Sequence, residues 1–397
     1  MYLNLFFLNK FYISNIEYMV KKLSTKCNFI NYTYLFVILV ILILIYYFNN
    51  SYQEHFSNNL KYYRCREKKI GTINNEIFQE NNIIQDNNDW NIYVPCGYNN
   101  VEKELLSIKA NSINNKYVYG INGCDSIVSK NKIWESLVNC FGRKEASLYM
   151  PESFVLHKSQ DMDLFRKIFD KNNIYILKKN IQRKEGLKLT SNLDVILDSV
   201  LDNYRVVQKY LTNLYLINKR KVNLRIYLLI VIKNGYKTFY VSNIGKCIYT
   251  RKEYSNNNFD FESNITSYNL DMNVYKTNPR NFNELYKYVN DTTKNGKILF
   301  NNIDILLRKV SQCLSKNIFQ SSNIKNTTCF QLFGADVIFD TNLNTYLLEL
   351  NKGPDMIPRD EYDKLMKKKV QEDMFRIVGI LPKTDNNVFY ETYTTSL

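Results

Sequence analysis

Two stretches near the C-terminus have the pattern of apolar and polar positions that is typical of paired β-strands. Residues 329–339 (CFQLFGADVIF) and 345–350 (TYLLEL) are rich in branched and aromatic side chains, and the DTNLN between them has turn composition. A symmetric antiparallel hairpin would place Asp336 opposite Glu349 on one face, with Asn351 pointing the same way. The other face would enter the core through Leu348, Leu350, Val337 and Phe339.

From residue 89 onward, short strand patterns alternate with helix patterns, which indicates an α/β or α+β domain. Strands are predicted at 116–121, 151–156, 174–179, 206–211, 221–232 and 235–254. Amphipathic helices are predicted at 100–108, 129–142, 161–169, 302–319 and 360–380. Residues 255–300 are rich in asparagine and are predicted to be mostly loop, and residues 383–397 are predicted to be a frayed tail.

The N-terminal part has a different pattern. Residues 1–31 are mixed apolar and basic, and residues 32–48 (YTYLFVILVILILIYYF) are uncharged and almost entirely apolar. We expect residues 32–48 to form a single transmembrane helix, slightly shorter than the usual ~20 residues, with tyrosines at its ends. A buried strand or helix is the alternative. Residues 49–88 have little periodicity and are predicted to be a flexible tether.

Composition narrows the partners. The formal charge of +15 favours an anionic partner, which could be nucleic acid, a membrane surface, a nucleotide or an acidic protein tail. The 8 cysteines form no CxxC motif, so we expect reduced, scattered thiols and a folded part that faces the reducing, ATP-containing cytoplasmic side of a membrane. With only 2 histidines, a two-histidine metalloprotease helix is excluded, and a histidine-based triad would have to use His157.

The predicted hairpin brings two carboxylates and an amide oxygen together, and oxygen ligands of this kind suit Mg²⁺. The alternative is an edge hairpin whose acids face water. In the predicted strand 221–232, alternation places Lys221, Asn223 and Arg225 on one face, where they could grip phosphates, although a solvated basic face gives the same pattern. The basic loop 180–192 lacks the P-loop motif, but it could close over phosphates or be an exposed hairpin tip.

The order of these features resembles the tubulin–tyrosine ligase family of ATP-grasp carboxylate–amine ligases. The resemblance covers roughly residues 91–381, and it is strongest in QKYLTNLYLINKRKVNLRIYLLI and FQLFGADVIFDTNLNTYLLELNKGPDM. It implies an α+β ATP-grasp fold with mostly antiparallel sheets, following the transmembrane helix. Its lobes would be an N-terminal lobe at 89–170, a central ATP-binding lobe at 171–217 and a C-terminal lobe with the magnesium site at 218–382.

The resemblance also implies where ATP would bind. Lys130, in VSKNKIW, and Lys178, in ILKKNIQRKEGL, would contact the nucleotide phosphates, and a loop from Arg183 to Gly186 would cover them. The adenine would be held, largely through backbone groups, by a hinge made of Gln208, Lys209, Tyr210 and Leu211.

For catalysis, the resemblance assigns Lys221 and Arg225 to the phosphates and the activated carboxylate, with Glu349 completing the catalytic set. The Mg²⁺ ligands would be Asp336, Glu349 and Asn351, which agrees with the hairpin geometry.

The chain departs from the family pattern at several positions. The family usually has Asp where this chain has Asn223, in a contact to the ribose that an amide can still make. The family's next Arg falls on Ile248, so Arg251 would have to replace it. Of the family's His-x-Thr-Asn sequence, in which Asn264 stands at the His position, only Thr266 is kept.

The function implied is that of a membrane-anchored, ATP-dependent ligase that joins a free amino acid to a protein carboxylate through an acyl phosphate. An acidic, tubulin-like tail would be the acceptor. The changes at Ile248 and Asn264 keep open a second hypothesis, a pseudoenzyme that binds nucleotide or an acidic partner without ligation. A nucleic-acid binder would rest on the charge alone, and we expect no nucleic-acid partner.

Overall fold

The structure is a computed structural model that describes residues 38–41, 60–65, 70–108, 116–181, 186–255, 259–266 and 272–397. The chain divides into two compact units, Met1–Asn58 and Asn59–Leu397. Of the expected transmembrane helix at 32–48, only residues 38–41 are described, as helix, and the rest lies outside the described residues. No helix formed by the described residues is long and apolar enough to cross a bilayer. The prediction of a single-pass, membrane-anchored protein is therefore wrong.

The second unit is an α+β fold built on a 10-stranded mixed sheet. Its antiparallel half consists of β14 (Phe389–Ser396), β11 (Tyr236–Tyr249), β10 (Arg220–Lys233), β12 (Thr328–Phe339) and β13 (Thr345–Asn351), and β9 (Leu216–Ile217) pairs with β10. Its parallel half continues from β12 through β4 (Tyr117–Tyr119), β3 (Ile92–Tyr93), β1 (Lys61–Tyr63) and β2 (Ile84–Gln85).

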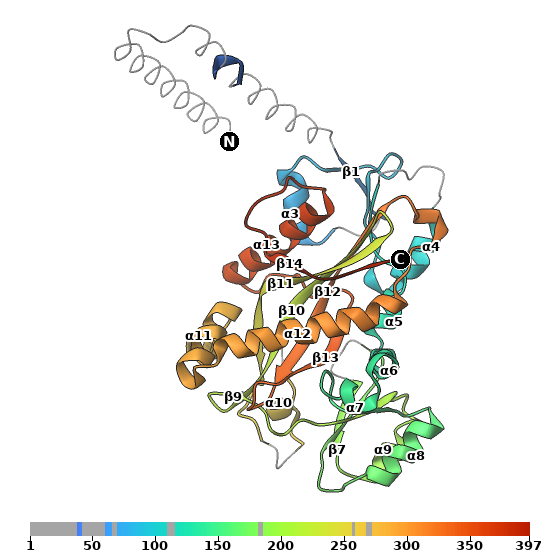
Figure 1. Cartoon of the computed structure of the whole chain (residues 1–397), viewed down its shortest axis with the longest axis vertical. Helices are drawn as coiled ribbons and strands as arrows, with labels where there is room; N and C mark the ends of the chain where they lie inside the picture. Colours follow the sequence, from blue (N-terminus) through green and yellow to red (C-terminus); the bar gives the residue numbers. More distant parts are fainter. Residues whose placement is uncertain are drawn as a thin grey trace. The chain divides into compact units, whose positions relative to one another are not determined.

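Strand β10 lies inside this sheet and is covered on both faces, which explains its nearly continuous apolar run. Leu228 and Ile230 belong to the same core as the helices α11 (Phe282–Thr293) and α12 (Gly296–Leu314), seen beside the strands in Figure 1. Leu229 faces the other way, into a core with α3 (Thr72–Glu80) and α13 (Glu361–Val378).

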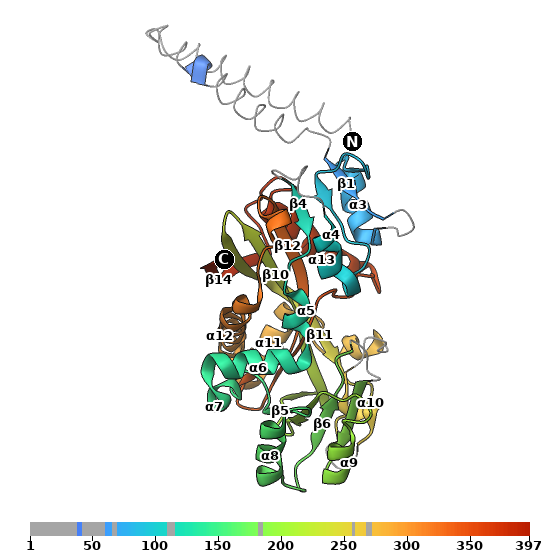
Figure 2. The same cartoon turned by 90° about the vertical axis from the view of Figure 1, so that its right-hand side faces the viewer.

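A separate, antiparallel 4-stranded sheet has the order β5 (Ser153–Val155), β8 (Val206–Lys209), β6 (Tyr175–Lys178) and β7 (Leu187–Thr190). The helices α8 (Ser159–Ile168) and α9 (Leu193–Asp198) lie on it, and together they form the lower part of Figure 2. Its core is independent of the large sheet and contains Phe154, Phe165 and Val207. The fold therefore presents two sheets, and the candidate site lies between them.

Four further α-helices lie between β3 and β5 in the sequence. They are α4 (Val101–Ser107), α5 (Cys124–Val128), α6 (Lys130–Phe141) and α7 (Arg143–Ala146). Helix α6 follows α5 after a single residue, Ser129, and contacts α12. The predicted helices at 100–108, 129–142, 161–169, 302–319 and 360–380 are thus confirmed within a few residues at their ends.

Three segments differ from expectation. Residues 60–65 and 70–88 are predicted to belong to a tether, but they contain β1, α3 and β2. Helix α3 forms because Ile73, Ile77 and Phe78 occur at helical spacing and are buried against α13. Residues 255–300 contain α10 (Phe261–Asn264) and α11 as well as loop.

The C-terminal residues are the third difference, because Phe389–Ser396 form β14 instead of a frayed tail. This strand pairs antiparallel with β11 from Tyr236 to Ser242 and closes one edge of the large sheet. In FYETYTTS only Phe389 and Thr392 are buried, so the sequence has no clear strand pattern, and pairing with β11 gives the backbone groups their partners.

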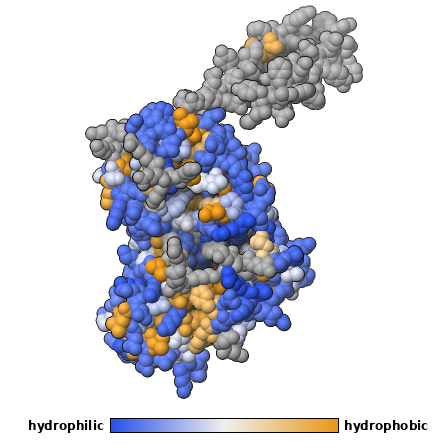
Figure 3. Space-filling view, turned by 180° about the vertical axis from the view of Figure 1, so that it is seen from behind, coloured by the Kyte–Doolittle hydropathy of each residue, from blue (hydrophilic) through white to orange (hydrophobic). Residues whose placement is uncertain are grey.

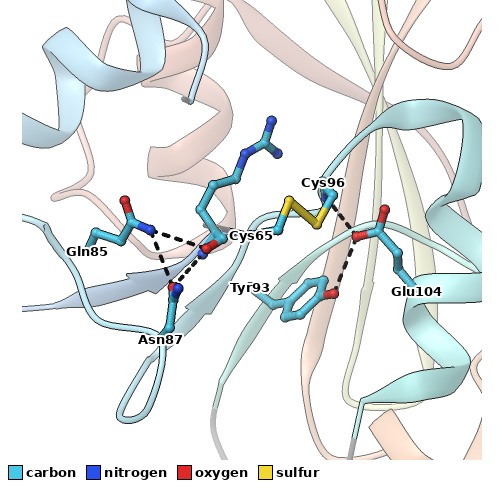
Figure 4. Close-up of a disulfide and its surroundings, with 7 residues drawn as sticks. Cys65, Gln85, Asn87, Tyr93, Cys96 and Glu104 are labelled. Carbon is cyan, nitrogen blue, oxygen red and sulfur yellow. Dashed lines mark hydrogen bonds between the residues drawn. A yellow bond between two sulfur atoms is a disulfide. The ribbon is translucent and has the colours of Figure 1, made fainter. Parts of the chain in front are cut away.

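The expectation of scattered reduced thiols is wrong for four cysteines, which form the disulfides Cys65–Cys96 and Cys140–Cys313. The first joins the end of β1 to the loop after β3, next to the Glu104 carboxylate that accepts a hydrogen bond from the Cys96 N–H (2.7 Å; Figure 4). The second joins α6 to α12. Partners so distant in sequence leave no spacing signal that could have predicted them.

Candidate active site

A cavity of about 440 Å³ lies between the two sheets. Strands β6, β7 and β8 of the small sheet supply one side, and strands β10, β11, β12 and β13 supply the other. The cavity is lined by eleven of the sixteen residues that the sequence analysis selected: Lys130, Lys178, Gln208, Lys209, Tyr210, Leu211, Lys221, Asn223, Thr266, Asp336 and Glu349. Arg225 and Asn351 do not line it, but both contact its carboxylates.

The hairpin of β12 and β13 has the predicted pairing at its functional end. Asp336 is opposite Glu349, and the Nδ2 atom of Asn351 lies 3.4 Å from Asp336 Oδ2 and 3.3 Å from Glu349 Oε1. Nearer the turn the register shifts, so that Val337 pairs with Leu347. The extra residue is Leu348, which lines the cavity instead of entering the core as expected.

Arg225 holds Asp336 from the neighbouring strand. Its Nε and Nη2 atoms donate to the two carboxylate oxygens of Asp336 at 2.6 and 3.1 Å, and β10 pairs Arg225 directly with Asp336. Both groups are largely buried, and burial raises the pKa of Asp336 against the opposing effect of Arg225. The ion pair fixes the Asp336 carboxylate so that its Oδ2 atom lies near Asn351, on the strand position opposite Glu349.

Glu349 is held by two lysines that come from different parts of the chain. Lys130, at the first position of α6, lies 3.2 Å from Glu349 Oε2, and it also donates to the carbonyl of Ile181 at 2.8 Å. Lys178, at the end of β6, donates to the Leu348 carbonyl at 3.3 Å. Burial opposes the ionisation of Glu349, but Lys130 and Lys178 hold its pKa below the ordinary value. Burial lowers the pKa of Lys178 itself to about 8.

Lys221 lies deeper in the cavity wall. Its Nζ atom donates to the Asn264 carbonyl at 2.9 Å and lies 3.1 Å from the Tyr210 hydroxyl, which also contacts Asn264. Burial lowers the pKa of Lys221 to about 7, and the positive charge of Lys178 acts in the same direction. No carboxylate of the described residues pairs with Lys221, so an anion in the cavity would be its counter-charge.

Asn223 and the hinge offer polar groups of the kind that a nucleoside needs. Asn223 Nδ2 donates to Thr266 Oγ1 at 3.0 Å, and its buried Oδ1 has no hydrogen-bond partner. Gln208 is buried and donates to Ser153 Oγ at 2.8 Å. The N–H groups of Lys209 and Tyr210 already bond to Glu152 and Ile174.

Two other predicted residues, Arg251 and Gly186, do not line this cavity. Arg251 is not among the residues that line the cavity, and its Nη1 lies 3.3 Å from Glu262 Oε1 near the surface. Gly186 accepts a hydrogen bond from the Lys179 N–H at 2.8 Å, which closes the loop between β6 and β7. Arg183 lies outside the described residues.

The sequence analysis did not select the apolar part of the cavity. Its walls include Pro151, Ile176, Leu187, Ile248, Ile265, Ile338 and Leu348. Ile176 and Leu187 belong to paired strands of the small sheet. Their alternation with core residues is the sequence pattern that could have placed them on the face toward the cavity. Strand patterns show which residues share a face, but they do not show which face another sheet will cover.

The residues of the cavity fit a magnesium nucleotide in their chemistry. Asp336, Glu349 and Asn351 offer hard oxygen ligands at one place, and four buried cations surround them: Lys130, Lys178, Lys221 and Arg225. The apolar walls and the unpaired Oδ1 of Asn223 suit a base and a ribose hydroxyl. An α+β fold with a carboxylate hairpin facing a small antiparallel sheet is the architecture expected of an ATP-grasp protein.

The comparisons with known proteins agree with this class. Residues 114–388 match the tubulin-tyrosine ligase family, and the chain belongs to that family. It is 26% identical to a tubulin monoglutamylase of Mus musculus over 287 residues, which are 66% of this chain and 24% of that protein. Two proteins of Tetrahymena thermophila are also similar: a probable beta-tubulin polyglutamylase, 23% identical over 60% of this chain and 22% of that protein, and tubulin glycylase 3F, 25% identical over 55% and 25%.

The chain thus spans about a quarter of the length of these curated relatives. The residues that match the family, 114–388, contain the cavity and its polar residues, since all of them lie between residues 130 and 351.

Proposed function

We propose that this protein is an ATP-dependent ligase that forms an amide bond between an amino acid and a carboxylate of a protein. The observation that carries the proposal is the convergence of Asp336 and Glu349 with three buried lysines in one cavity of a tubulin-tyrosine ligase family chain. Arg225 and Asn351 contact Asp336 beside this cavity. Several relatives are named as enzymes that modify tubulin, which supports an acidic tubulin tail as the acceptor.

Each polar residue has a role in this proposal. Asp336, Glu349 and Asn351 would hold Mg²⁺, which supplies charge neutralisation at the phosphates. Lys130 contacts Glu349, and Lys178 donates to the Leu348 carbonyl. Both lysines would turn toward the phosphate oxygens of ATP, because these oxygens compete with their present partners. Lys221 would gain the counter-charge that the described residues do not provide. Asn223 would accept a ribose hydroxyl at its unpaired Oδ1.

The proposed chemistry needs no protein nucleophile. The acceptor carboxylate would attack the γ-phosphorus of ATP, giving an acyl phosphate and ADP. The amine of the amino acid would then attack the acyl carbon, release phosphate and lose a proton to form the amide. Arg225, adjacent to Asp336, is placed to stabilise negative charge on the carbonyl oxygen in the second step.

A small basic hollow beside Arg225 supports an acidic acceptor. Its walls include four cations, Arg225, Lys246, Arg359 and Lys367, and the aromatic residues Tyr227 and Tyr275. Among the described residues, three carboxylates pair with these four cations, and Asp336 is the partner of Arg225. Asp363 pairs with both Lys246 and Lys367, and Asp355 pairs with Arg359. The positive charge that remains favours a carboxylate-rich chain. The face of the molecule seen in Figure 3 is mostly hydrophilic.

The first test is nucleotide binding by thermal shift. We expect Mg-ATP to raise the melting temperature of the wild type and to leave Glu349→Gln unchanged, because the variant lacks a ligand and the partner of Lys130. The control is Glu391→Gln on β14, which should respond as the wild type does. An equal response of Glu349→Gln and wild type would place the nucleotide elsewhere.

The second test is phosphate release from ATP in the presence of acidic tail peptides and labelled amino acids. A ligase releases phosphate only when acceptor and amino acid are both present, and it transfers the label to the peptide. The apolar Ile248 in the cavity wall, where the family usually has Arg, favours the alternative of a pseudoenzyme. That alternative predicts a thermal shift with Mg-ATP and no acceptor-dependent phosphate release.

A further inference from the structure

A second cavity, of about 340 Å³, lies beside the segment Pro354 to Ile357, which follows the carboxylate hairpin in the sequence. It shares no lining residue with the cavity between the sheets. One wall is the segment Pro354 to Ile357, a second is the start of α3, and a third is the loop from Val94 to Tyr98. The second and third walls precede residues 114–388, so the cavity combines the family domain with a part of this chain outside it.

One end of this second cavity is electropositive. Helix α3 begins after Gly71, no side chain caps it, and the first N–H groups of a helix have no acceptor within the helix. Gly71, Thr72, Ile73 and Asn74 all line the cavity, so this helix end faces it. The guanidinium of Arg64 lies in the same wall, half-buried. Together they favour a carboxylate.

Two buried amide side chains offer hydrogen-bond acceptors to this cavity. The side-chain oxygens of Asn74 on α3 and Gln371 on α13 have no hydrogen-bond partner, although these residues are only 8% and 3% exposed and both line the cavity. A buried carbonyl oxygen without a donor is costly, so these positions call for a ligand with N–H groups. The carboxylate of Asp355 in the same wall adds negative charge.

The rest of the wall is mainly aliphatic and aromatic: Ile70, Ile73, Val94, Pro95, Tyr98, Tyr119, Met356 and Ile357. A ligand for this cavity must therefore combine a carboxylate, N–H donors and an apolar part within a small volume. We propose that the cavity binds a free α-amino acid, with its carboxylate at the start of α3 beside Arg64 and its ammonium group at the Asn74 and Gln371 oxygens.

The position of the cavity gives this ligand a role, and only the role rests on the proposed ligase function. Asp355 lines both this cavity and the basic hollow that contains Arg225. A Cβ atom built on Gly334 would lie 3.0 Å from Arg225 Cδ and 3.2 Å from Pro354 Cβ, so one layer of chain separates the two places. An amino acid held here would be stored beside the site at which its amine is consumed.

The binding test is calorimetric titration of the full chain with the twenty amino acids in the absence of ATP. We expect saturable binding of amino acids with apolar side chains. Gln371→Met should weaken it at least tenfold, because the variant removes the acceptor and keeps the volume. The N-acetyl derivative of the best ligand should bind at least tenfold more weakly, since it lacks the ammonium group. An N-terminally free dipeptide distinguishes a chain end from a free amino acid, and equal affinity for it would overturn the proposal.

Two further variants keep the result interpretable. Ile357→Trp fills the cavity from an exposed position (66% exposed), so it should fold and should abolish amino-acid binding. Glu349→Gln should bind the amino acid as the wild type does, and Gln371→Met should still respond to Mg-ATP. Absence of amino-acid binding in the wild type, or unchanged binding in Ile357→Trp, would overturn the proposal. If Mg-ATP does not raise the melting temperature of the wild type, that result would instead contradict the proposed ligase function.

Discussion

At the scale of single residues, the cavity between the sheets is an assembly of charges that is incomplete without an anion. Lys130, Lys178, Lys221 and Arg225 bring four positive charges, whereas Asp336 and Glu349 bring two negative charges. The lysines use backbone carbonyls in place of the missing counter-charge. Burial makes this arrangement costly, and it lowers the pKa of Lys178 and Lys221 to about 8 and about 7.

The lowered pKa of Lys221 predicts a pH dependence of stability. Between pH 7 and the ordinary lysine pKa the unfolded chain carries this proton and the folded chain does not, so the free energy of unfolding rises with pH in that window. We expect this group to add on the order of 2 kcal/mol between pH 7 and pH 9. Urea unfolding of the wild type and Lys221→Met at both pH values measures the difference. The variant should be the more stable at pH 7 and should show a smaller rise, because Lys178, with its pKa of about 8, remains.

The Arg225–Asp336 pair predicts a strong coupling. Either Arg225→Met or Asp336→Leu leaves a buried charge alone, and we expect each to lower the free energy of unfolding by about 3–5 kcal/mol. The double variant removes both charges and should cost much less than the sum. Chemical unfolding of the four proteins gives the cycle. Additive losses would mean that the two side chains do not depend on each other.

At the scale of elements, the site depends on how α5 and α6 are attached to the hairpin. Lys130 at the start of α6 contacts Glu349, and Asp125 of α5 forms an ion pair with Lys352, directly after Asn351. The buried Gln331 of β12 donates to the Lys352 carbonyl at 3.0 Å and accepts from the Ile121 N–H at 3.2 Å. Three side chains thus determine where the end of β13 lies.

The Asp125–Lys352 pair predicts an asymmetric result. The side chain of Lys352 is 8% exposed and that of Asp125 is 52% exposed. Asp125→Asn leaves a buried cation without its partner and should cost about 1–3 kcal/mol of stability, whereas Lys352→Met leaves a carboxylate facing water and should cost less than about 1 kcal/mol. Thermal unfolding tests the order. Both variants should also weaken the Mg-ATP response, since Asn351 loses a neighbour that positions it.

At the scale of the whole molecule, the large sheet is continuous from β14 to β2, with segments from both ends of the described chain. The strand β14 adds to the edge of β11, and β1, β2 and β3 extend the sheet on the far side of β4. The helices α3 and α13, far apart in sequence, pack together through Phe78 and Phe375, whose ring centroids are 5.3 Å apart. The large sheet therefore depends on strands near both ends of the unit Asn59–Leu397.

Truncation at the C-terminus tests this dependence. Ending the chain after Asn386 removes β14 together with the buried Val388 and Phe389, and it exposes the β11 edge. We expect a fall of at least 5 °C in the melting temperature and aggregation through the open edge. The matched control ends after Thr394 and should stay within about 2 °C of the full chain. Equal melting temperatures for both truncations would mean that β14 contributes nothing to stability.

Much of the fold could be predicted from local patterns. Alternation in KVNLRIY placed Lys221, Asn223 and Arg225 on one face, and hairpin symmetry placed Asp336 opposite Glu349. These predictions succeed because a strand has a strict period of two and a short turn limits the register. The bulge at Leu348 and the disulfides could not be predicted, because each depends on partners from other parts of the chain.

The sequence by itself determined the secondary structure of the family domain, the convergence of the hairpin oxygens and the family resemblance, since local spacing controls the first two and ordered motifs control the third. Only the tertiary structure decided that Lys130 meets Glu349, that β1, β2 and β14 extend the sheet, and that a second cavity forms beside Pro354. The physical reason is that burial and partner choice are properties of surfaces in contact, and short-range periodicity carries no information about which surfaces meet.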